Sequence, residues 1–184
     1  AWGYYSNCSH ENNSYIAEYA ISLELLHKAS ILLDDLIDED TARHGHKTFH
    51  IQHSKSEALL YAIYMLNRSI DLMLDSDTIE HSRTAILLGI VDYMARGGIK
   101  EVSSAGRIFS LEDVKELIEL ETIPLIKNSF VLGYLFSAPT VLDTPGAIVN
   151  IGYSCGYCFQ VLNDIEPFSA PDINQKYKGS INYD

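Results

Sequence analysis

The chain has 184 residues, 47% of them hydrophobic and 21% charged, so it is long and apolar enough for one folded domain and is not intrinsically disordered. Its 25 acidic residues against 13 basic ones give a net charge of −12, which argues against nucleic acid as a partner because phosphate backbones would be repelled. No apolar run approaches the about 20 residues of a transmembrane helix, and the three cysteines are too few for a disulfide framework. We therefore expect a protein that is not transmembrane and works in the cytoplasm.

We expect residues 1–184 to form a single helical domain, incomplete at one or both ends, because the chain starts without methionine and stops in a polar stretch. Apolar residues at helical spacing predict helices over residues 15–38, 56–73, 77–95, 111–137 and 146–166. Ser110 is the expected N-cap of the fourth helix and Pro124 its expected kink. Glycines 97 and 98 are expected to stop the third helix, and Pro167 the last. No alternating pattern predicts a strand, so the predicted fold class is all-α.

The first predicted helix ends in the acidic run Asp34-Asp35-Leu36-Ile37-Asp38. Asp34 and Asp38 are four residues apart and share a helical face, with Asp35 beside them. Carboxylates at this spacing repel each other, and the C-terminal end of a helix disfavours negative charge. A Mg²⁺ ion that also binds substrate phosphates would explain the arrangement, and a solvent-facing acidic helix end is the alternative. The apolar stripe of the helix runs into Asp34 and Asp38, so we expect both to face the interior.

Residues 39–54 are polar, contain Gly45 and are predicted to connect the first two helices. Within them, Arg43 and His44 place cationic donors just beyond the carboxylates. Because a guanidinium can contact a phosphate through two hydrogen bonds, Arg43 is a candidate phosphate ligand. An exposed basic segment is the alternative.

In the last predicted helix, Gly152, Gly156, Gln160 and Asp164 fall on one stripe. The two glycines either allow another helix to approach closely or leave space for a ligand, and Gln160 and Asp164 form a polar end to that groove. The C-x-x-C pair Cys155 and Cys158 is interpreted as small core residues rather than as a redox or metal site. Two helices that each end in inward-facing acids predict a cavity with metal at its mouth and apolar walls, which suits a polyisoprenyl substrate.

These segments resemble the isoprenyl diphosphate synthase family. Residues 24–38 look like its first aspartate-rich motif, DDxxD, with the preceding helix, and Arg43-His44-Gly45 resembles the RRG that follows. Lys127-Asn128 takes the place of a family Lys-Thr pair. The run from Gly156 to Asp164 resembles the second motif, GxxFQxxDDxxD. The resemblance covers about residues 17–182.

The resemblance implies an isoprenoid-synthase-like bundle of long helices around a deep central cavity. It implies a Mg²⁺-dependent prenyltransferase that ionises an allylic prenyl diphosphate and condenses it with isopentenyl diphosphate to give a longer prenyl diphosphate, acting as a homodimer. The metal-binding residues would be Asp34, Asp35, Asp38 and Asp164. The catalytic residues would be Asp34, Asp35 and Lys127. The substrate-binding residues would be Arg43, His44, Lys127, Gln160 and Lys176.

The second motif departs from the family pattern. Asn163 replaces its first aspartate and Pro167 its last, so one carboxylate of three remains. Two alternatives follow. The first is a class I terpene cyclase, which shares the ionisation step and often begins this motif with Asn-Asp. The second is a non-catalytic subunit of a prenyl synthase, favoured by the altered second motif and opposed by the intact first one.

Overall fold

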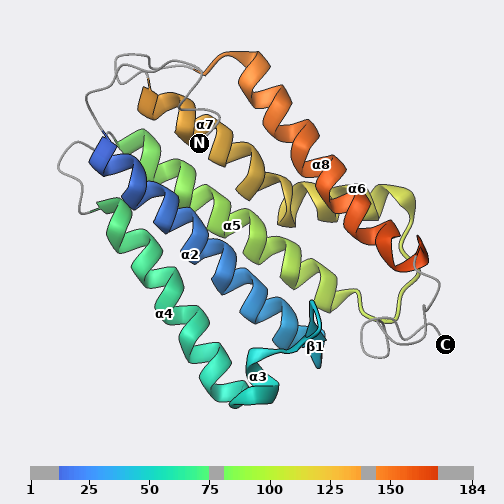
Figure 1. Cartoon of the computed structure of the whole chain (residues 1–184). Helices are drawn as coiled ribbons and strands as arrows, with labels where there is room; N and C mark the ends of the chain where they lie inside the picture. The colour runs from blue at the N-terminus through green and yellow to red at the C-terminus, as the bar shows by residue number, and fades with distance from the viewer. Residues whose placement is uncertain (1–12, 75–80, 138–143, 170–184) are drawn as a thin grey trace.

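The computed structural model describes residues 13–74, 81–137 and 144–169 (Figure 1). Over these ranges the chain forms seven helices and one two-stranded hairpin. In chain order they are α2 (Asn13–Ile37), β1 (Ala42–Arg43), β2 (His46–Lys47), α3 (Phe49–Gln52), α4 (Lys55–Leu74), α5 (His81–Ser103), α6 (Leu111–Glu121), α7 (Ile123–Ser137) and α8 (Gly146–Ser169). The predicted all-α class is therefore confirmed.

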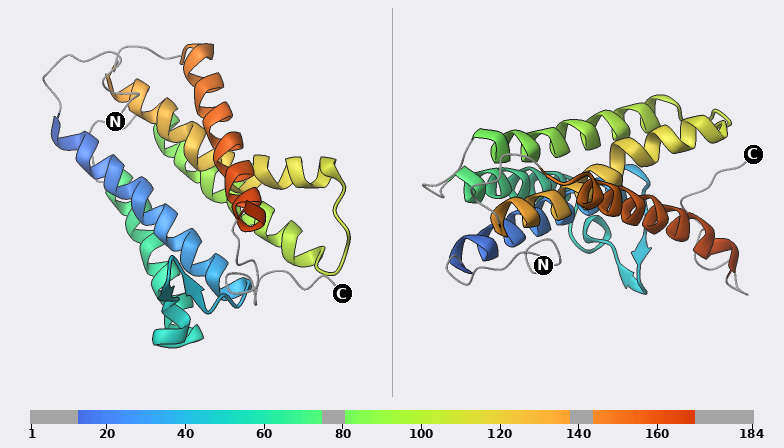
Figure 2. Two further views of the ribbon diagram at one scale, coloured as in Figure 1. Left: turned by 45° about the vertical axis from the view of Figure 1, so that its right-hand side comes forward. Right: turned by 90° about the horizontal axis from the view of Figure 1, so that it is seen from above.

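The bundle is built from two helix pairs, α2 with α4 and α7 with α8, and α5 contacts members of both pairs (Figures 1 and 2). Small residues let α2 and α4 approach closely: Ala29, Ala58 and Ala62 are almost completely buried, and Ser22 Oγ donates a hydrogen bond to the carbonyl of Ser69 at 2.7 Å. Larger side chains fill the space between the pairs. These core residues are Tyr19, Leu26, Met73, Leu87, Ile90 and Leu132.

The break between α6 and α7 lies where Pro124 was expected to kink one long helix. Pro124 has no backbone N–H to continue the helical ladder, and α6 ends at Glu121 while α7 starts at Ile123. Ser110 caps α6 as predicted, because its Oγ accepts a hydrogen bond from the N–H of Asp113 at 3.2 Å. The chain therefore changes direction at Thr122.

Two predicted helix ends are wrong, and the predicted connection contains unpredicted structure. α5 continues through Gly97 and Gly98 to Ser103, because the missing side chain of Gly97 leaves room for Glu121 of the neighbouring helix instead of ending the helix. α8 continues through Pro167 to Ser169. Residues 39–54 contain the hairpin and the short α3. Two-residue strands are too short to produce an alternating pattern in the sequence.

The polar ends of the helices gather at one end of the bundle. Figure 1 shows α2, α5 and α8 running in the same direction, so that their C-terminal ends point the same way. Cys155 and Cys158 are exposed on α8, so the prediction that they pack in the core is wrong; the buried face of α8 runs through Gly152 and Gly156. Cys8 lies outside the described residues. No helix in the described ranges is long and apolar enough to cross a membrane.

Candidate active site

Asp34 and Asp35 lie in the last turn of α2 and Asp38 directly follows it, but the exposure of these aspartates differs from the prediction. Asp34 and Asp38 were expected to face the interior, yet both are exposed, with 62% of the Asp34 side chain accessible. Asp35 is the buried one, with 6% of its side chain accessible. The apolar stripe of α2 does not account for the burial of Asp35. Its carboxylate is held by a residue outside the helix, because Arg43 Nε donates a hydrogen bond to Asp35 Oδ1 at 2.7 Å.

The hairpin after α2 brings Arg43 back to the helix end. β1 and β2 pair antiparallel, with Arg43 opposite His46, and the two connecting residues are His44 and Gly45. Both have left-handed backbone conformations, with φ of 50° and 79°, as in a type I′ turn. Arg43 Nη2 lies 3.7 Å from Asp34 Oδ2, so one guanidinium serves two aspartates, while His44 is exposed at the tip of the turn.

Negative charge at this helix end is only partly compensated. Desolvation and then the charge of Asp38 raise the pKa of Asp34 to about 6, even though much of its side chain is accessible. Desolvation and then the charge of Asp40 raise the pKa of Asp38. Arg43 opposes both shifts without cancelling them. A divalent cation would stabilise the ionised carboxylates here by the same electrostatic rule.

The polar end of α8 is held by close packing against α7. A Cβ atom on Gly152 would lie 2.8 Å from the Cα of Lys127, and one on Gly156 would lie 3.1 Å from the Cα of Ile123, so the glycines serve helix packing. Beyond them, Gln160 Nε2 donates a hydrogen bond to Asp164 Oδ1 at 2.8 Å. The stripe predicted from the sequence therefore leads to a fixed amide and carboxylate.

Two glutamates outside both aspartate motifs face this end of the bundle, and the sequence reasoning missed them. Desolvation, then the charges of Asp38 and Asp164, raise the pKa of Glu101, so Glu101 interacts electrostatically with an aspartate of each motif. Desolvation and then Glu101 raise the pKa of Glu121 to about 8, with smaller effects of Asp34 and Asp38.

Glu121 reaches this position across Gly97, on which a Cβ atom would lie 2.3 Å from Glu121 Cγ. Gly97 and Glu101 are four residues apart and share a face of α5. If the predicted third helix had been extended past Gly97, Glu101 would have been placed on the same helical face as Gly97.

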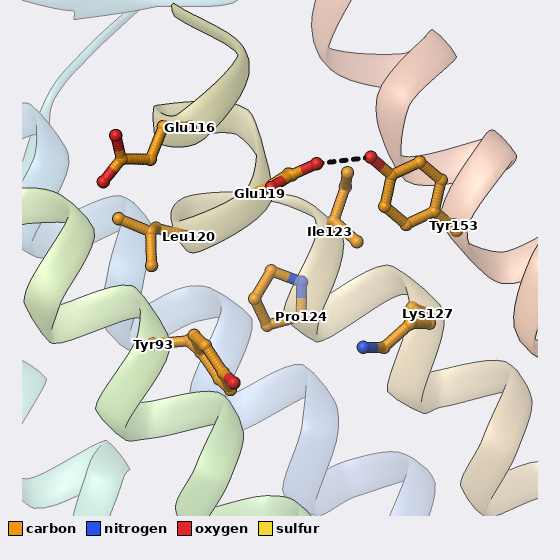
Figure 3. Close-up of a pocket in the computed structure, with 8 residues that line it drawn as sticks. All are labelled: Tyr93, Glu116, Glu119, Leu120, Ile123, Pro124, Lys127 and Tyr153. Carbon is orange, nitrogen blue, oxygen red and sulfur yellow. Dashed lines mark hydrogen bonds between the residues drawn. The ribbon is translucent and has the colours of Figure 1, made fainter. Parts of the chain in front are cut away.

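Among the described residues, Lys127 makes no ion pair with the aspartates of either motif. Lys127 lines a pocket of about 250 Å³ together with residues of α5, α6, α7 and α8. Figure 3 shows its ammonium group directed across this pocket toward Tyr93, and Tyr153 of α8 donates a hydrogen bond to Glu119 at 2.6 Å. Lys176 lies outside the described residues. Of the predicted substrate-binding residues, Arg43 and Gln160 are therefore the two that adjoin the aspartates.

The donor set suits a hard cation. All the acidic groups at this end are carboxylates, the ligands that Mg²⁺ prefers. In residues 13–74, 81–137 and 144–169, no three Asp, Glu, His or Cys side chains converge closely enough to form a complete metal cage. Mg²⁺ commonly takes one or two protein carboxylates and completes its octahedron with water and phosphate oxygens, so the residues present fit that mode of binding.

The comparisons with known proteins agree with the fold. The sequence profile of the polyprenyl synthetase family matches residues 3–178. This chain belongs to the polyprenyl synthetase family. One curated relative is heptaprenyl diphosphate synthase component 2 of Geobacillus stearothermophilus, to which this chain is 28% identical over 158 residues. The match covers 83% of this chain and 47% of that protein.

Solved structures share the fold of this polyprenyl synthetase chain. Geranylgeranyl pyrophosphate synthase from Lactobacillus brevis superposes with a TM-score of 0.81 at 20% identity, covering 92% of the chain and 52% of that protein. A geranyltransferase from Helicobacter pylori, complexed with magnesium and isoprenyl diphosphate, superposes with a TM-score of 0.72 at 22% identity, covering 92% and 61%. The chain spans about half the length of the curated relatives it matches.

Proposed function

We propose that the protein is a Mg²⁺-dependent prenyltransferase that condenses an allylic prenyl diphosphate with isopentenyl diphosphate. The observation that carries the proposal is the arrangement of carboxylates at one end of the bundle, Asp34 and Asp38 from α2 and Asp164 from α8, in a chain of the polyprenyl synthetase family. The H. pylori geranyltransferase complexed with magnesium and isoprenyl diphosphate supports the choice of cation and substrate class.

In this proposal Asp34, Asp35 and Asp38 bind metal at the end of α2, and Asp164 binds another metal ion at the end of α8. Asp34 and Asp38 are the accessible members of the first motif, while Asp35 is engaged by Arg43. When bound, the cation neutralises the diphosphate and makes it a better leaving group. The diphosphate leaves with the electrons of the allylic C–O bond, the alkene of isopentenyl diphosphate forms the new C–C bond, and a proton is lost.

The chain's own residues orient the substrate. Arg43 is placed beside Asp34 by the hairpin, so its guanidinium would contact diphosphate oxygens next to the metal. Gln160 donates a hydrogen bond to Asp164 and would line the space that the substrate occupies. His44, Lys127 and Lys176 are further proposed diphosphate ligands, and replacement of each side chain by alanine is the test; Lys127 would act from the pocket that it lines, not from beside the aspartates.

A second candidate is a subunit that acts with another chain. One aspartate in the second motif favours it, and one relative bears the name component 2 of a heptaprenyl diphosphate synthase. We further propose, from the family resemblance and the sparse cysteines, that the protein is a cytoplasmic homodimer. Size-exclusion chromatography with light scattering and cell fractionation test these two points.

Product analysis by mass spectrometry tests the function directly. The full-length protein would be incubated with Mg²⁺ and dimethylallyl, geranyl, farnesyl or geranylgeranyl diphosphate, each with and without isopentenyl diphosphate. A longer diphosphate made only with isopentenyl diphosphate supports the proposal. A hydrocarbon or alcohol made without it would indicate a terpene cyclase, and no product from the isolated protein would favour the subunit.

A further inference from the structure

A chain of two hydrogen bonds connects the break between α6 and α7 to the aspartate of α8. Thr122 Oγ1 donates to Gln160 Oε1 at 2.7 Å, and Gln160 Nε2 donates to Asp164 Oδ1 at 2.8 Å. Thr122 and Gln160 are both half-buried, and Asp164 is exposed. The path therefore runs from the interior of the bundle to a carboxylate at its surface.

The helix break makes Thr122 available for this contact. Thr122 is the C-cap of α6, and its backbone N–H still bonds to the carbonyl of Ile118 at 3.2 Å. Pro124 prevents α6 from continuing as one regular helix. Threonine side chains in regular helices often bond to the carbonyl four residues earlier; here the hydroxyl instead reaches the neighbouring helix.

The glycines of α8 bring Gln160 within reach. Gly156 lies one turn before Gln160 and packs against Ile123, the residue that follows Thr122. Because a Cβ atom on Gly156 would lie 3.1 Å from the Cα of Ile123, any larger residue would push α8 away from the break. The 2.7 Å bond between Thr122 and Gln160 depends on this close approach.

The chemistry of the three groups allows one hydrogen-bond direction. An ionised carboxylate is an acceptor only, so the Gln160 amide must present its nitrogen to Asp164. Its oxygen then faces Thr122, whose hydroxyl must donate. Thr122 therefore determines which way the Gln160 amide is turned, and the amide in turn holds one oxygen of Asp164 and leaves the other free.

We propose that Thr122 is a positioning residue for Asp164 and acts on it through Gln160. This inference rests on the proposed function, in which Asp164 binds the divalent cation. With Asn163 and Pro167 in place of two motif aspartates, Asp164 is the remaining aspartate of the second motif, and its orientation matters more than in a site with several ligands. Groups that orient metal ligands commonly change metal affinity about 10- to 100-fold when removed.

The test is Mn²⁺ binding to the metal-free full-length protein, measured by isothermal titration calorimetry with Mn²⁺ alone. Thr122→Val keeps the shape and removes the hydroxyl, and we expect about tenfold weaker Mn²⁺ binding. Thr122→Ser keeps the hydroxyl and should bind Mn²⁺ within about twofold of wild type. Ser129→Ala is the matched control, because Ser129 lies on α7 and its hydroxyl bonds to the carbonyl of Leu125. Circular dichroism and Tm establish that each variant folds.

A double-mutant cycle separates the outcomes. If Thr122 acts through Asp164, Thr122→Val should weaken Mn²⁺ binding no further in an Asp164→Ala background. Three results would overturn the inference and leave the proposed function intact. The first is an equal loss of Mn²⁺ affinity in Thr122→Val and Thr122→Ser, and the second is an additive loss in the double variant. The third is wild-type Mn²⁺ affinity in Thr122→Val when Asp164→Ala binds Mn²⁺ more weakly. Unchanged Mn²⁺ binding in both Asp34→Ala and Asp164→Ala would overturn the proposed metal site itself.

Discussion

The two acidic helix ends stabilise their carboxylates with different partners. The end of α2 carries three aspartates close in sequence, and the hairpin supplies Arg43 as a partner for two of them. At the end of α8, Asp164 accepts a hydrogen bond from the Gln160 amide, and that amide accepts one from the hydroxyl of Thr122. The α2 end is therefore built by local sequence, whereas the α8 end depends on a contact across 38 residues.

Loss of a metal ligand at the α2 end should have the largest effect. We expect Asp34→Ala to lower turnover by at least about 100-fold, since metal assistance to leaving-group departure contributes several kcal/mol. The fold should be intact because the Asp34 side chain is accessible. Asp71→Ala, which removes an exposed acid on α4, is the control. Steady-state kinetics with Mg²⁺ makes the measurement, and equal rates for the two variants would refute the assignment of Asp34.

Removal of Arg43 tests whether the α2 end needs its own cation. Arg43→Ala leaves the buried carboxylate of Asp35 without its partner, and we expect the free energy of unfolding to fall by about 2–4 kcal/mol. Lys55→Ala breaks an exposed pair with Glu39 and should cost no more than about 0.5 kcal/mol. Urea unfolding compares them, and similar losses would mean that Arg43 does not stabilise the helix end.

Close packing of α8 is the corresponding requirement at the other end. We expect Gly152→Ala to lower the free energy of unfolding by about 1–3 kcal/mol, because the new methyl group would meet the backbone of Lys127 at 2.8 Å. A Cβ atom on Gly98 meets nothing within 4 Å, so Gly98→Ala should stabilise α5 by up to about 1 kcal/mol. Thermal unfolding of the two variants measures both changes in stability. If Gly98→Ala destabilised the protein and Gly152→Ala did not, the prediction would be contradicted.

Glu121 adds a pH dependence between the two ends. Its pKa is raised from the ordinary 4.5 to about 8 in the metal-free folded protein, so folding takes up a proton between these values. The stability from this group is therefore fully present below about pH 4.5 and is lost as the pH rises through about 8.

We expect Glu121→Gln to flatten this dependence and to raise the free energy of unfolding at pH 9 by about 1–2 kcal/mol. Urea unfolding from pH 5 to 9 measures it, with the exposed Glu112→Gln on the same helix as control. Parallel pH curves for Glu121→Gln and wild type would contradict the assignment.

The smallest expected effect comes from restoring an acid to α8. Asn163 is exposed beside Asp164, and Asn163→Asp should keep turnover or raise it by no more than about tenfold if the site is a weakened form of the family motif. The Mg²⁺ concentration for half-maximal rate should fall as well. A large loss of turnover would show that the asparagine has a function of its own.

Much of the helical architecture follows from the sequence, because helical spacing and capping are local properties. Three local signals predicted features that the structure contains: Ser110 a helix start, Pro124 a helix break, and the run from Asp34 to Asp38 an acidic helix end. Gly97 and Pro167 misled the prediction of helix ends. At Gly97 the helix continues because the absent side chain makes room for Glu121, and α8 continues through Pro167 to Ser169. The exposure of Cys155 and Cys158 was missed because the face of α8 that packs against α7 runs through Gly152 and Gly156.

The all-α class, the family and the acidic end of α2 could all be predicted from the sequence, since each depends on residues that are neighbours along the chain. The tertiary structure decided that Asp35 rather than Asp34 is buried, that Glu101 and Glu121 join the acidic end, and that Thr122 reaches Gln160. The contact that buries Asp35 joins α2 to the hairpin, and the others join residues from different helices. Their existence depends on how closely the helices pack, which no spacing along one helix reports.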